Sequence, residues 1–348
     1  MFNTAIKIGA NSINENSPVY IIAEAGVNHG GDIKIAMQLI DIASEAGADA
    51  VKFQAFRTEH LILDHVEKAA YQKVTTESKE SQSDMLRKLE LKNEQYSILK
   101  AYCLKKNIQF LITPFDEQSL LELEAIGVDA YKVASTDTTN LPFLIKIAKT
   151  KKPILLSTGM CDMKEVEAAV ATIKQFNKDL ILLQCTANYP IEDDEANLKV
   201  ISEFKRKFSC LVGYSDHSVG IGAAPFAIPF GAVVLEKHFT INKDDAGPDH
   251  LASLDPIELA NFVKLVRKVE KYIGSAVKEP TKAEKLTKKA LQKYLVAKTK
   301  INLGEVFSLE NIVGKRTGGK GISPLHYKEI IGKVARKTFQ KDQIIEID

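Results

Sequence analysis

The chain of 348 residues is 45% hydrophobic and 26% charged, which is ordinary composition for a globular protein. Its formal net charge of +2 gives no reason to expect nucleic acid or an anionic membrane as its main partner. The N-terminus lacks the basic and then apolar pattern of a signal peptide, and no apolar run approaches the ~20 residues of a membrane span. The four cysteines are isolated, so we expect a reduced, cytoplasmic protein without a membrane segment.

Eight short runs of β-forming residues recur along the chain, and periodic helical segments separate most of them. The runs lie at residues 19–26, 50–56, 109–115, 130–135, 153–159, 180–187, 211–217 and 233–239. Alternating strands and helices predict a parallel sheet, and eight such units predict an α/β fold, the (β/α)8 or TIM barrel. An open doubly wound sheet is the alternative, but its phosphate-binding G-x-G-x-x-G pattern does not follow the first strand.

Local signals mark where helices begin and end. Asp32 is a candidate N-cap for a helix that Gly47 closes, and Pro256 begins a long helix that ends before Gly274. After Gly274 the composition becomes strongly charged, and then short β runs alternate with turns. We therefore expect a barrel domain at 1–275, a linker at 276–289 and a small β-rich domain at 290–348. A domain this small has a marginal core, so docking on a larger body would stabilise it.

Polar side chains stand at the ends of all eight predicted strands. In a (β/α)8 barrel these ends meet at one open face, where active sites lie. The residues are Glu24, Lys52, Gln54, Thr113, Lys132, Ser135, Ser157, Asn188, Tyr189, Ser215, His217 and His238. Polar groups at every strand end predict a functional site at this face.

Two histidines end neighbouring strands of the predicted barrel. Adjacent strands lie about 5 Å apart, so the imidazoles of His217 and His238 can converge on one ion. A single histidine at a strand end is more often a hydrogen-bonded structural residue. Two of them near Glu24 and Asp249 favour a labile Mn²⁺ or Mg²⁺ site with open positions over a closed zinc site.

Lys52 and Lys132 follow apolar residues in the second and fourth strands. A lysine that projects into the barrel mouth is costly unless it meets an anion or extends to solvent. Nearby hydroxyl groups are suited to phosphate or carboxylate, and they come from Thr113, Ser135, Ser157 and Ser215. Together these residues predict a small, multiply charged anionic substrate beside the metal.

Motifs along nearly the whole chain resemble, in the same order, those of the bacterial sialic acid (nonulosonate) synthases. They read IIAEAGVNHGG, AVKFQAF, YKVAS, LLSTGM, GYSDHS, LEKHFT and AGPDH, and the tail LVAKTKINLGEVFSLENIVGKR resembles the antifreeze-like (SAF, β-clip) domain of that family. The resemblance implies an enzyme that condenses phosphoenolpyruvate with an N-acylated mannosamine-type sugar, releasing phosphate and forming a nine-carbon 2-keto acid. It also implies a domain-swapped homodimer in which each small domain covers the partner's barrel.

The resemblance further implies a role for each candidate residue. His217 and His238 would bind the metal, and Glu24 and Asp249 would position the sugar and the metal-bound groups. Phosphoenolpyruvate would be held by Lys52, Lys132, Thr113, Ser135, Ser157 and Ser215. Gln54, Asn188 and Tyr189 would line the substrate site, and Arg316 would arrive from the partner's small domain to contact the N-acyl group.

Several positions depart from the family pattern. Asp137 stands where the family commonly has a glutamate, so a shorter carboxylate must reach its proton position. Gln184 stands where histidine is frequent, and Ala187 stands where asparagine or threonine is frequent. These departures leave the metal ligands and the lysines in place, and they bear on sugar specificity and on the proton donor.

Three alternatives accompany the main expectation that N-acetylmannosamine is the acceptor and N-acetylneuraminate the product. Within the family, 2,4-diacetamido-2,4,6-trideoxymannose would give N,N'-diacetyllegionaminate, and the segment at 69–91 resembles both groups. A related barrel would condense phosphoenolpyruvate with a phosphorylated aldose, but the antifreeze-like tail speaks against it. A non-enzymatic ice- or carbohydrate-binding protein would not need polar groups at every strand end.

Overall fold

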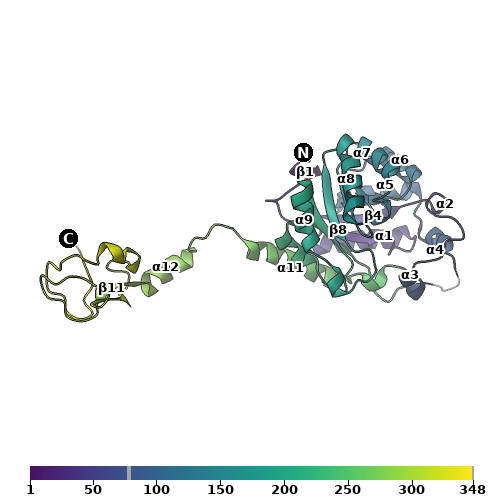
Figure 1. Cartoon of the computed structure of the whole chain (residues 1–348). Coiled ribbons are helices and arrows are strands. Elements are labelled where there is room, and N and C mark those ends of the chain that lie inside the picture. Colours follow the sequence, from purple (N-terminus) through teal and green to yellow (C-terminus); the bar gives the residue numbers. More distant parts are fainter. Residues whose placement is uncertain (77–79, 347–348) are drawn as a thin grey trace. The chain divides into compact units, whose positions relative to one another are not determined.

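A computed structural model describes residues 1–76 and 80–346 of the chain. It contains two compact units, Met1–Gly274 and Ser275–Asp348 (Figure 1). Among the described residues, no helix combines the length and the apolar character needed to cross a bilayer.

The first unit is a nearly closed barrel of eight parallel strands. Its strands are β3 (Tyr20–Gly26), β4 (Ala50–Ala55), β5 (Gln109–Pro114), β6 (Tyr131–Val133), β7 (Ile154–Ser157), β8 (Leu180–Cys185), β9 (Leu211–Asp216) and β10 (Ala232–His238). They follow the order β5-β4-β3-β10-β9-β8-β7-β6, and β5 and β6 lie next to each other. Every ladder in this sheet is parallel, which confirms the predicted (β/α)8 barrel.

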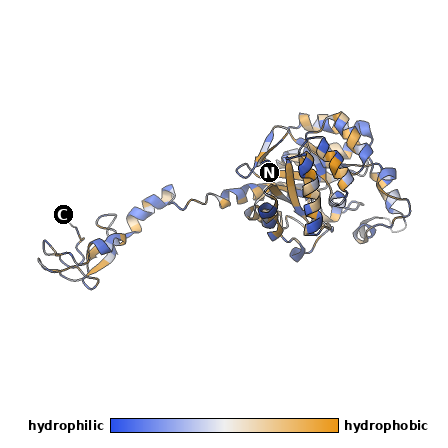
Figure 2. Cartoon of the chain, turned by 45° about the horizontal axis from the view of Figure 1, so that its top comes forward, coloured by the Kyte–Doolittle hydropathy of each residue, from blue (hydrophilic) through white to orange (hydrophobic). Residues whose placement is uncertain are grey.

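Helices surround the barrel and pack their apolar faces on it. They are α1 (Ile33–Ala46), α5 (Asn93–Lys105), α6 (Glu117–Ile126), α7 (Leu141–Lys149), α8 (Met163–Phe176), α9 (Lys199–Phe208), α10 (Ala224–Ala227) and α11 (Pro256–Ile273). Between β4 and α5 lie three shorter helices, α2 (Thr58–Leu61), α3 (Ala70–Thr75) and α4 (Gln82–Leu89). Figure 2 shows the resulting pattern, with hydrophobic residues along the strands and mixed colouring along the helices.

The expected helix boundaries are confirmed at both positions examined in the sequence. The Asp32 carboxylate accepts a hydrogen bond from the Lys34 backbone at 2.7 Å, which caps the start of α1. Gly47 ends α1 with a φ of 82°, a left-handed conformation that favours glycine. Pro256 is the first residue of α11 and Gly274 follows its last turn.

An antiparallel hairpin that the sequence analysis did not identify closes the N-terminal end of the barrel. Its strands are β1 (Ala5–Ile8) and β2 (Asn11–Asn14). Ile6, Ile8 and Ile13 are buried in one apolar cluster with inward-facing residues of the barrel strands. These strands are short and carry polar residues on their other face, so their hydrophobic signal is weak.

The inward-facing positions of the barrel change from apolar to polar along each strand. For example, Ala50 precedes Lys52 by two positions and Leu155 precedes Ser157, and alternate residues of a strand point to the same side. Eight residues form the polar level, which we call the polar layer: Glu24, Lys52, Thr113, Lys132, Ser157, Cys185, Ser215 and Glu236. The apolar levels below it join the hairpin cluster, so polar chemistry is confined to the C-terminal end.

The second unit has a small core of its own. Its strands β11 (Lys293–Ala297) and β12 (Ile312–Arg316) pair antiparallel, and Leu295, Phe307 and Phe339 lie in its buried cluster. The segment expected as a linker carries helix α12 (Lys282–Leu291), which is capped by Thr281 and buries none of its own residues within the described chain.

Candidate active site

A cavity of about 670 Å³ opens at the C-terminal ends of the barrel strands, and the polar layer lines it. This volume is within the usual range for small-molecule sites. All of the residues that line the cavity belong to the first unit.

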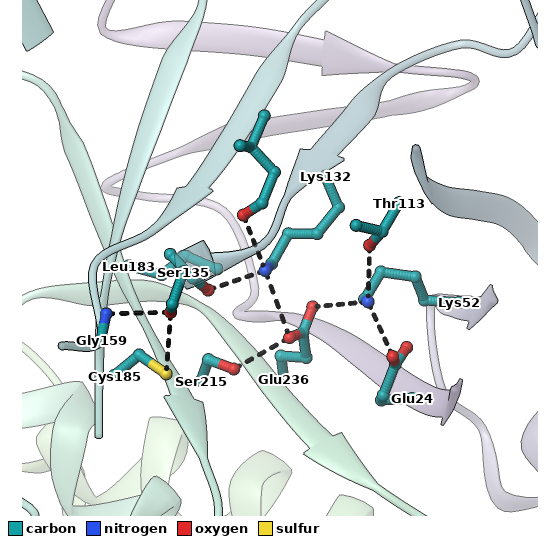
Figure 3. A network of polar contacts seen from close by, with 12 residues as sticks. Glu24, Lys52, Thr113, Lys132, Ser135, Gly159, Leu183, Cys185, Ser215 and Glu236 are labelled. Carbon is teal, nitrogen blue, oxygen red and sulfur yellow. Dashed lines mark hydrogen bonds and ion pairs between the residues drawn. The ribbon is translucent and has the colours of Figure 1, made fainter. Parts of the chain in front are cut away.

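Two lysines and two carboxylates form the centre of the polar layer (Figure 3). Lys52 Nζ lies 2.8 Å from Glu24 Oε1 and 3.9 Å from Glu236 Oε2. Lys132 Nζ lies 3.6 Å from Glu236 Oε1. Glu236 therefore stands between the two ammonium groups, and Glu24 lies on the far side of Lys52.

Hydroxyl groups from neighbouring strands complete this network. Lys52 donates to Thr113 Oγ1 at 3.0 Å, and Lys132 donates to Ser157 Oγ at 2.7 Å. Ser215 Oγ donates to Glu236 Oε1 at 2.9 Å. These bonds hold the lysine ammonium groups in fixed positions at the floor of the cavity, which is the preorganisation that anion binding requires.

The charges of the network favour an additional anion. Burial disfavours the charged form of Lys52, but Glu236 and Glu24 outweigh it and raise the pKa of Lys52. Burial also opposes ionisation of Glu236, yet Lys132 and Lys52 lower its pKa. Burial raises the pKa of Glu24 to about 7, against the opposing effect of Lys52. Near neutral pH Glu24 is thus only partly ionised and balances the charge of Lys52 in part, which favours the binding of a further anion.

Lys132 shows the need for that anion most directly. Burial lowers the pKa of Lys132, and the attraction of Glu236 only partly opposes this effect. An anionic group bound beside its ammonium would reduce the cost of keeping the charge in a buried position. Phosphate or carboxylate would meet this requirement, as the sequence analysis expected of Lys52 and Lys132.

The two candidate metal ligands lie side by side above the polar layer. The ring centroids of His217 and His238 are 5.4 Å apart, and both side chains are buried. His217 Nδ1 donates to the Thr186 carbonyl at 2.7 Å, so Nε2 carries the lone pair whenever the ring is neutral. Burial lowers the pKa of His217, but Cys185 and the Thr186 carbonyl outweigh this effect and raise it. His238 Nδ1 is buried without a hydrogen-bond partner among the described residues, and it lies 3.7 Å from Asp249 Oδ2.

The surroundings of the histidines fit a divalent cation. Burial lowers the pKa of His238 well below its usual value, so the ring is neutral and can act as a ligand. Among the described residues, no three or more His, Cys, Asp or Glu side chains are grouped so that they could hold a metal ion. The donor set is therefore two imidazoles with carboxylates close by.

Gly26 keeps open the space beside these carboxylates. A Cβ at this position would lie 3.3 Å from Asp249 Oδ2, 3.4 Å from Glu24 Oε1 and 3.4 Å from Gln54 Nε2. Its φ of 53° is also a conformation that most residues avoid. The absence of a side chain thus leaves three polar groups facing one small space at the end of β3.

Most of the remaining candidate residues also line the cavity. Ser135 Oγ accepts from the Gly159 backbone at 2.9 Å, and Asn140 donates to Asp137 Oδ1 at 3.0 Å. Burial raises the pKa of Asp137. The ring of Tyr189 lies 4.0 Å from that of His217, between centroids.

Two candidates lie elsewhere. Asn188 is exposed and does not line the cavity, because the chain beyond β8 turns Tyr189 inward and leaves its neighbour facing solvent. Arg316 is the last residue of β12 in the second unit, where its side chain is exposed.

Several residues of the cavity were not among the sequence-predicted site residues, and Glu236, Cys185 and Tyr71 are three of them. Glu236 precedes His238 by two positions, so strand alternation alone could have placed it in the site. Cys185 ends β8 with its Sγ 3.6 Å from Ser135 Oγ, but a thiol in an apolar strand gives little signal. Tyr71 comes from α3, and its ring lies 5.2 Å from that of Tyr189. Only the path of the chain between β4 and α5 brings it there.

Family models and curated relatives match most of the chain. The NeuB family model matches residues 39–278, and the SAF domain model matches residues 292–348. The N,N'-diacetyllegionaminic acid synthase of Campylobacter jejuni is 44% identical over 328 residues, covering 93% of this chain and 98% of that protein. The synthase of the same name from Legionella pneumophila is 41% identical, covering 90% of this chain and 89% of that protein.

A solved structure is similar as well. It is the N-acetylneuraminic acid (sialic acid) synthetase from Leptospira borgpetersenii in complex with citrate. The two chains superimpose with a TM-score of 0.73 and 37% sequence identity, over 82% of this chain and 95% of that chain.

The anion-binding role of the lysines can be tested by substitution. We expect Lys52→Met and Lys132→Met each to raise the KM for phosphoenolpyruvate by about 10-fold or more, the order of one charge-assisted hydrogen bond. The KM for the sugar should change much less, because the lysines lie at the floor of the cavity. Steady-state measurement of phosphate release gives both constants.

Lys237→Met is the matched control. Lys237 is fully buried and its Nζ lies 2.9 Å from Asp216 Oδ2, but it does not line the cavity. We expect a lower melting temperature and an unchanged KM for phosphoenolpyruvate. Equal increases of both Michaelis constants in the Lys52 and Lys132 variants would show that these lysines are structural.

Proposed function

Because the chain belongs to the NeuB family, and is thus a phosphoenolpyruvate-dependent synthase that forms a carbon–carbon bond, we propose that it makes N,N'-diacetyllegionaminate. Its substrates are then phosphoenolpyruvate and 2,4-diacetamido-2,4,6-trideoxymannose, and its second product is phosphate. The observation that supports this choice is the near full-length similarity to two synthases of that name. This similarity favours 2,4-diacetamido-2,4,6-trideoxymannose as the acceptor over N-acetylmannosamine, the main expectation from the sequence.

The polar layer supplies a site for the enol substrate. We propose that Lys52 and Lys132 bind its phosphate and carboxylate, with Thr113, Ser157 and Ser215 as further hydrogen-bond partners. Ser135 lies at the same end of the cavity and presents its hydroxyl next to the Gly159 backbone. Fixing the enol in one orientation against the sugar aldehyde contributes much of the acceleration, because it replaces a random encounter with a bound geometry.

The histidine pair and its carboxylates supply the site for the aldehyde. We propose that His217 and His238 hold Mn²⁺ or Mg²⁺, which when bound polarises the aldehyde oxygen as a Lewis acid. Asp249, next to His238, and Gln54, next to Glu24, then orient the sugar chain by hydrogen bonds to its hydroxyl groups.

The reaction forms one carbon–carbon bond and breaks one carbon–oxygen bond. Carbon three of the enol attacks the aldehyde carbon, whose oxygen gains a proton, and carbon two of the former enol becomes electron-deficient. Water adds to carbon two and loses a proton, and the resulting tetrahedral centre expels phosphate to leave the 2-keto acid. The atoms therefore balance with one water consumed for each phosphate released.

Two carboxyl groups of the chain can carry the protons. Glu24 Oε2 is buried and has no hydrogen-bond partner among the described residues, and the pKa of Glu24 is about 7. A group with this pKa can take a proton from water and give it up again near neutral pH. Asp137 lies at the cavity wall with its pKa raised by burial, and we propose that it exchanges protons at the aldehyde oxygen.

Phosphate release with purified protein tests the proposal. We expect phosphate from phosphoenolpyruvate in the presence of 2,4-diacetamido-2,4,6-trideoxymannose, and a kcat/KM at least about 10-fold lower with N-acetylmannosamine, the range that one pocket contact can discriminate. Phosphoenolpyruvate alone is the control and should give no phosphate above background. Higher kcat/KM with N-acetylmannosamine would show that the product is N-acetylneuraminate instead.

Metal dependence is a separate expectation. A chelator should abolish turnover, and Mn²⁺ or Mg²⁺ should restore it. His217→Ala and His238→Ala should each lower kcat at least about 100-fold, which corresponds to about 2.7 kcal/mol of barrier. The control is His326→Ala, because His326 is an exposed histidine of the second unit. Full activity in either barrel variant would refute the metal assignment.

The second unit has a role that mixed dimers can test. We propose that the enzyme is a domain-swapped homodimer in which Arg316 of one subunit reaches the sugar in the partner's barrel. Arg316→Ala and His217→Ala subunits should each be nearly inactive, whereas their mixed dimers should regain part of the activity, because one intact barrel then meets one intact Arg316. Mixed dimers that demonstrably form without any recovery would contradict this arrangement.

A further inference from the structure

The chain between β4 and α5 builds one side of the cavity. Eleven described residues of this segment line the cavity, and we call six of them the insertion wall: Leu61, Ile62, Tyr71, Met85, Leu86 and Leu89. The other five are Phe56, His60, Ala69, Gln72 and Gln82. Five of the six are aliphatic or thioether side chains. Met85 and Leu89 are buried in a cluster with Val27 and Phe56, so the wall is backed by further apolar residues.

Buried polar contacts hold this wall in place. Gln72 Oε1 accepts from the Ala69 backbone and from Gln82 Nε2, each at 2.9 Å. Lys68 Nζ donates to Thr76 Oγ1 at 2.8 Å and lies 3.4 Å from Glu80 Oε1. These contacts join both ends of α3 to the start of α4, so Tyr71 on α3 has a defined position.

Tyr71 connects the wall to the place where the aldehyde would bind. Its ring lies 5.2 Å from that of Tyr189, which in turn lies 4.0 Å from His217 and 5.4 Å from His238. Burial raises the pKa of Tyr71, and the charge of Asp249 adds to the effect. Tyr71 is therefore a neutral, partly buried ring close to the histidine pair.

The wall and the polar layer offer opposite chemistry. Among the described residues, the lysine and arginine side chains that line the cavity are Lys52 and Lys132, and both belong to the polar layer. A sugar whose aldehyde lies at the histidines must extend its other end away from that layer. The insertion wall presents this end with an aromatic ring and apolar side chains.

On the basis of the proposed function, we infer that the insertion wall is the binding subsite for carbons four to six of the acceptor sugar and selects a methyl group at carbon six. Burying a methyl group against apolar side chains is favourable in free energy, because it removes apolar surface from water. Burying a hydroxyl group there is unfavourable, because the hydroxyl group gives up hydrogen bonds to water without gaining new ones. A phosphate group would in addition bring charge next to the six side chains of the wall, none of which is cationic. Tyr71 contributes the face of its ring, which covers the sugar next to Tyr189.

Apolar contacts discriminate between a methyl group and a hydroxymethyl group only to a limited extent. A hydrophobic pocket rejects an added hydroxyl group by about 10- to 100-fold in kcat/KM. We therefore expect the wild-type protein to prefer the 6-deoxy sugar over its 6-hydroxy counterpart within that range. It should give no measurable turnover with N-acetylmannosamine 6-phosphate.

Two substitutions test the subsite, with kcat/KM for the 6-deoxy and 6-hydroxy sugars as the readout. Tyr71→Ala should reduce the preference for the 6-deoxy sugar to below about 3-fold, because water then enters the contact. Tyr71→Phe should retain the preference, since the ring face remains. Leu61→Lys, at a partly buried position, should bring measurable turnover of the 6-phosphate sugar. The KM for phosphoenolpyruvate should stay within about 2-fold in all three variants.

Tyr272→Ala is the matched control, because Tyr272 is 72% exposed on α11 and does not line the cavity. It should leave the preference unchanged. If the folded Tyr71→Ala protein keeps the wild-type preference, or loses kcat/KM equally for both sugars, the subsite assignment is wrong while the proposed function stands.

Failure of the proposed function has a different signature. In that case the wild-type protein releases no phosphate with the diacetamido sugar, and isothermal titration of the two sugars replaces the kinetic readout. Tighter binding of the 6-deoxy sugar that disappears in Tyr71→Ala would still support the subsite. Equal binding of both sugars by the wild-type protein would overturn it.

Discussion

The buried arrangement of Glu236 between Lys52 and Lys132 is the interaction on which the rest of the site depends. Each of the two ammonium groups lies within 4 Å of a Glu236 carboxylate oxygen in the interior of the barrel, and removing Glu236 would leave both buried positive charges without this partner. Such an arrangement is costly in an empty protein and becomes favourable when an anion binds. We therefore expect this network to favour a charged substrate, because the fold already holds its groups in place.

The barrel makes this network possible by separating apolar from polar levels along each strand. The N-terminal hairpin and the inward-facing residues near the start of each strand form a buried apolar cluster below the polar layer. A charged residue one step lower in any strand would lose access to the cavity. The polar groups therefore lie at a level where they both contact hydrogen-bond partners on neighbouring strands and line the cavity.

The outer face of the same strands supports the histidine pair. Lys237 and Asp216 form an ion pair at 2.9 Å between β10 and β9, and both are fully buried outside the barrel. Each directly adjoins one histidine in sequence, His238 or His217, and successive strand residues point to opposite sides. The ion pair therefore lies behind the imidazoles and joins the ends of the two strands that carry them.

The sequence by itself determined the eight strands and the polar residues at their ends, among them Lys52, Lys132 and the hydroxyl-bearing residues. It could do so because strand alternation and capping are local, with a period of two residues in a strand and defined residues at helix ends. Only the tertiary structure decided that Glu236 stands between the lysines, that burial brings the pKa of Glu24 to about 7 and that Asn188 faces solvent. The tertiary structure also decided that the ring of Tyr71 lies next to that of Tyr189. Contacts between such distant segments depend on how the barrel closes and on the path that the chain takes from β4 to α5.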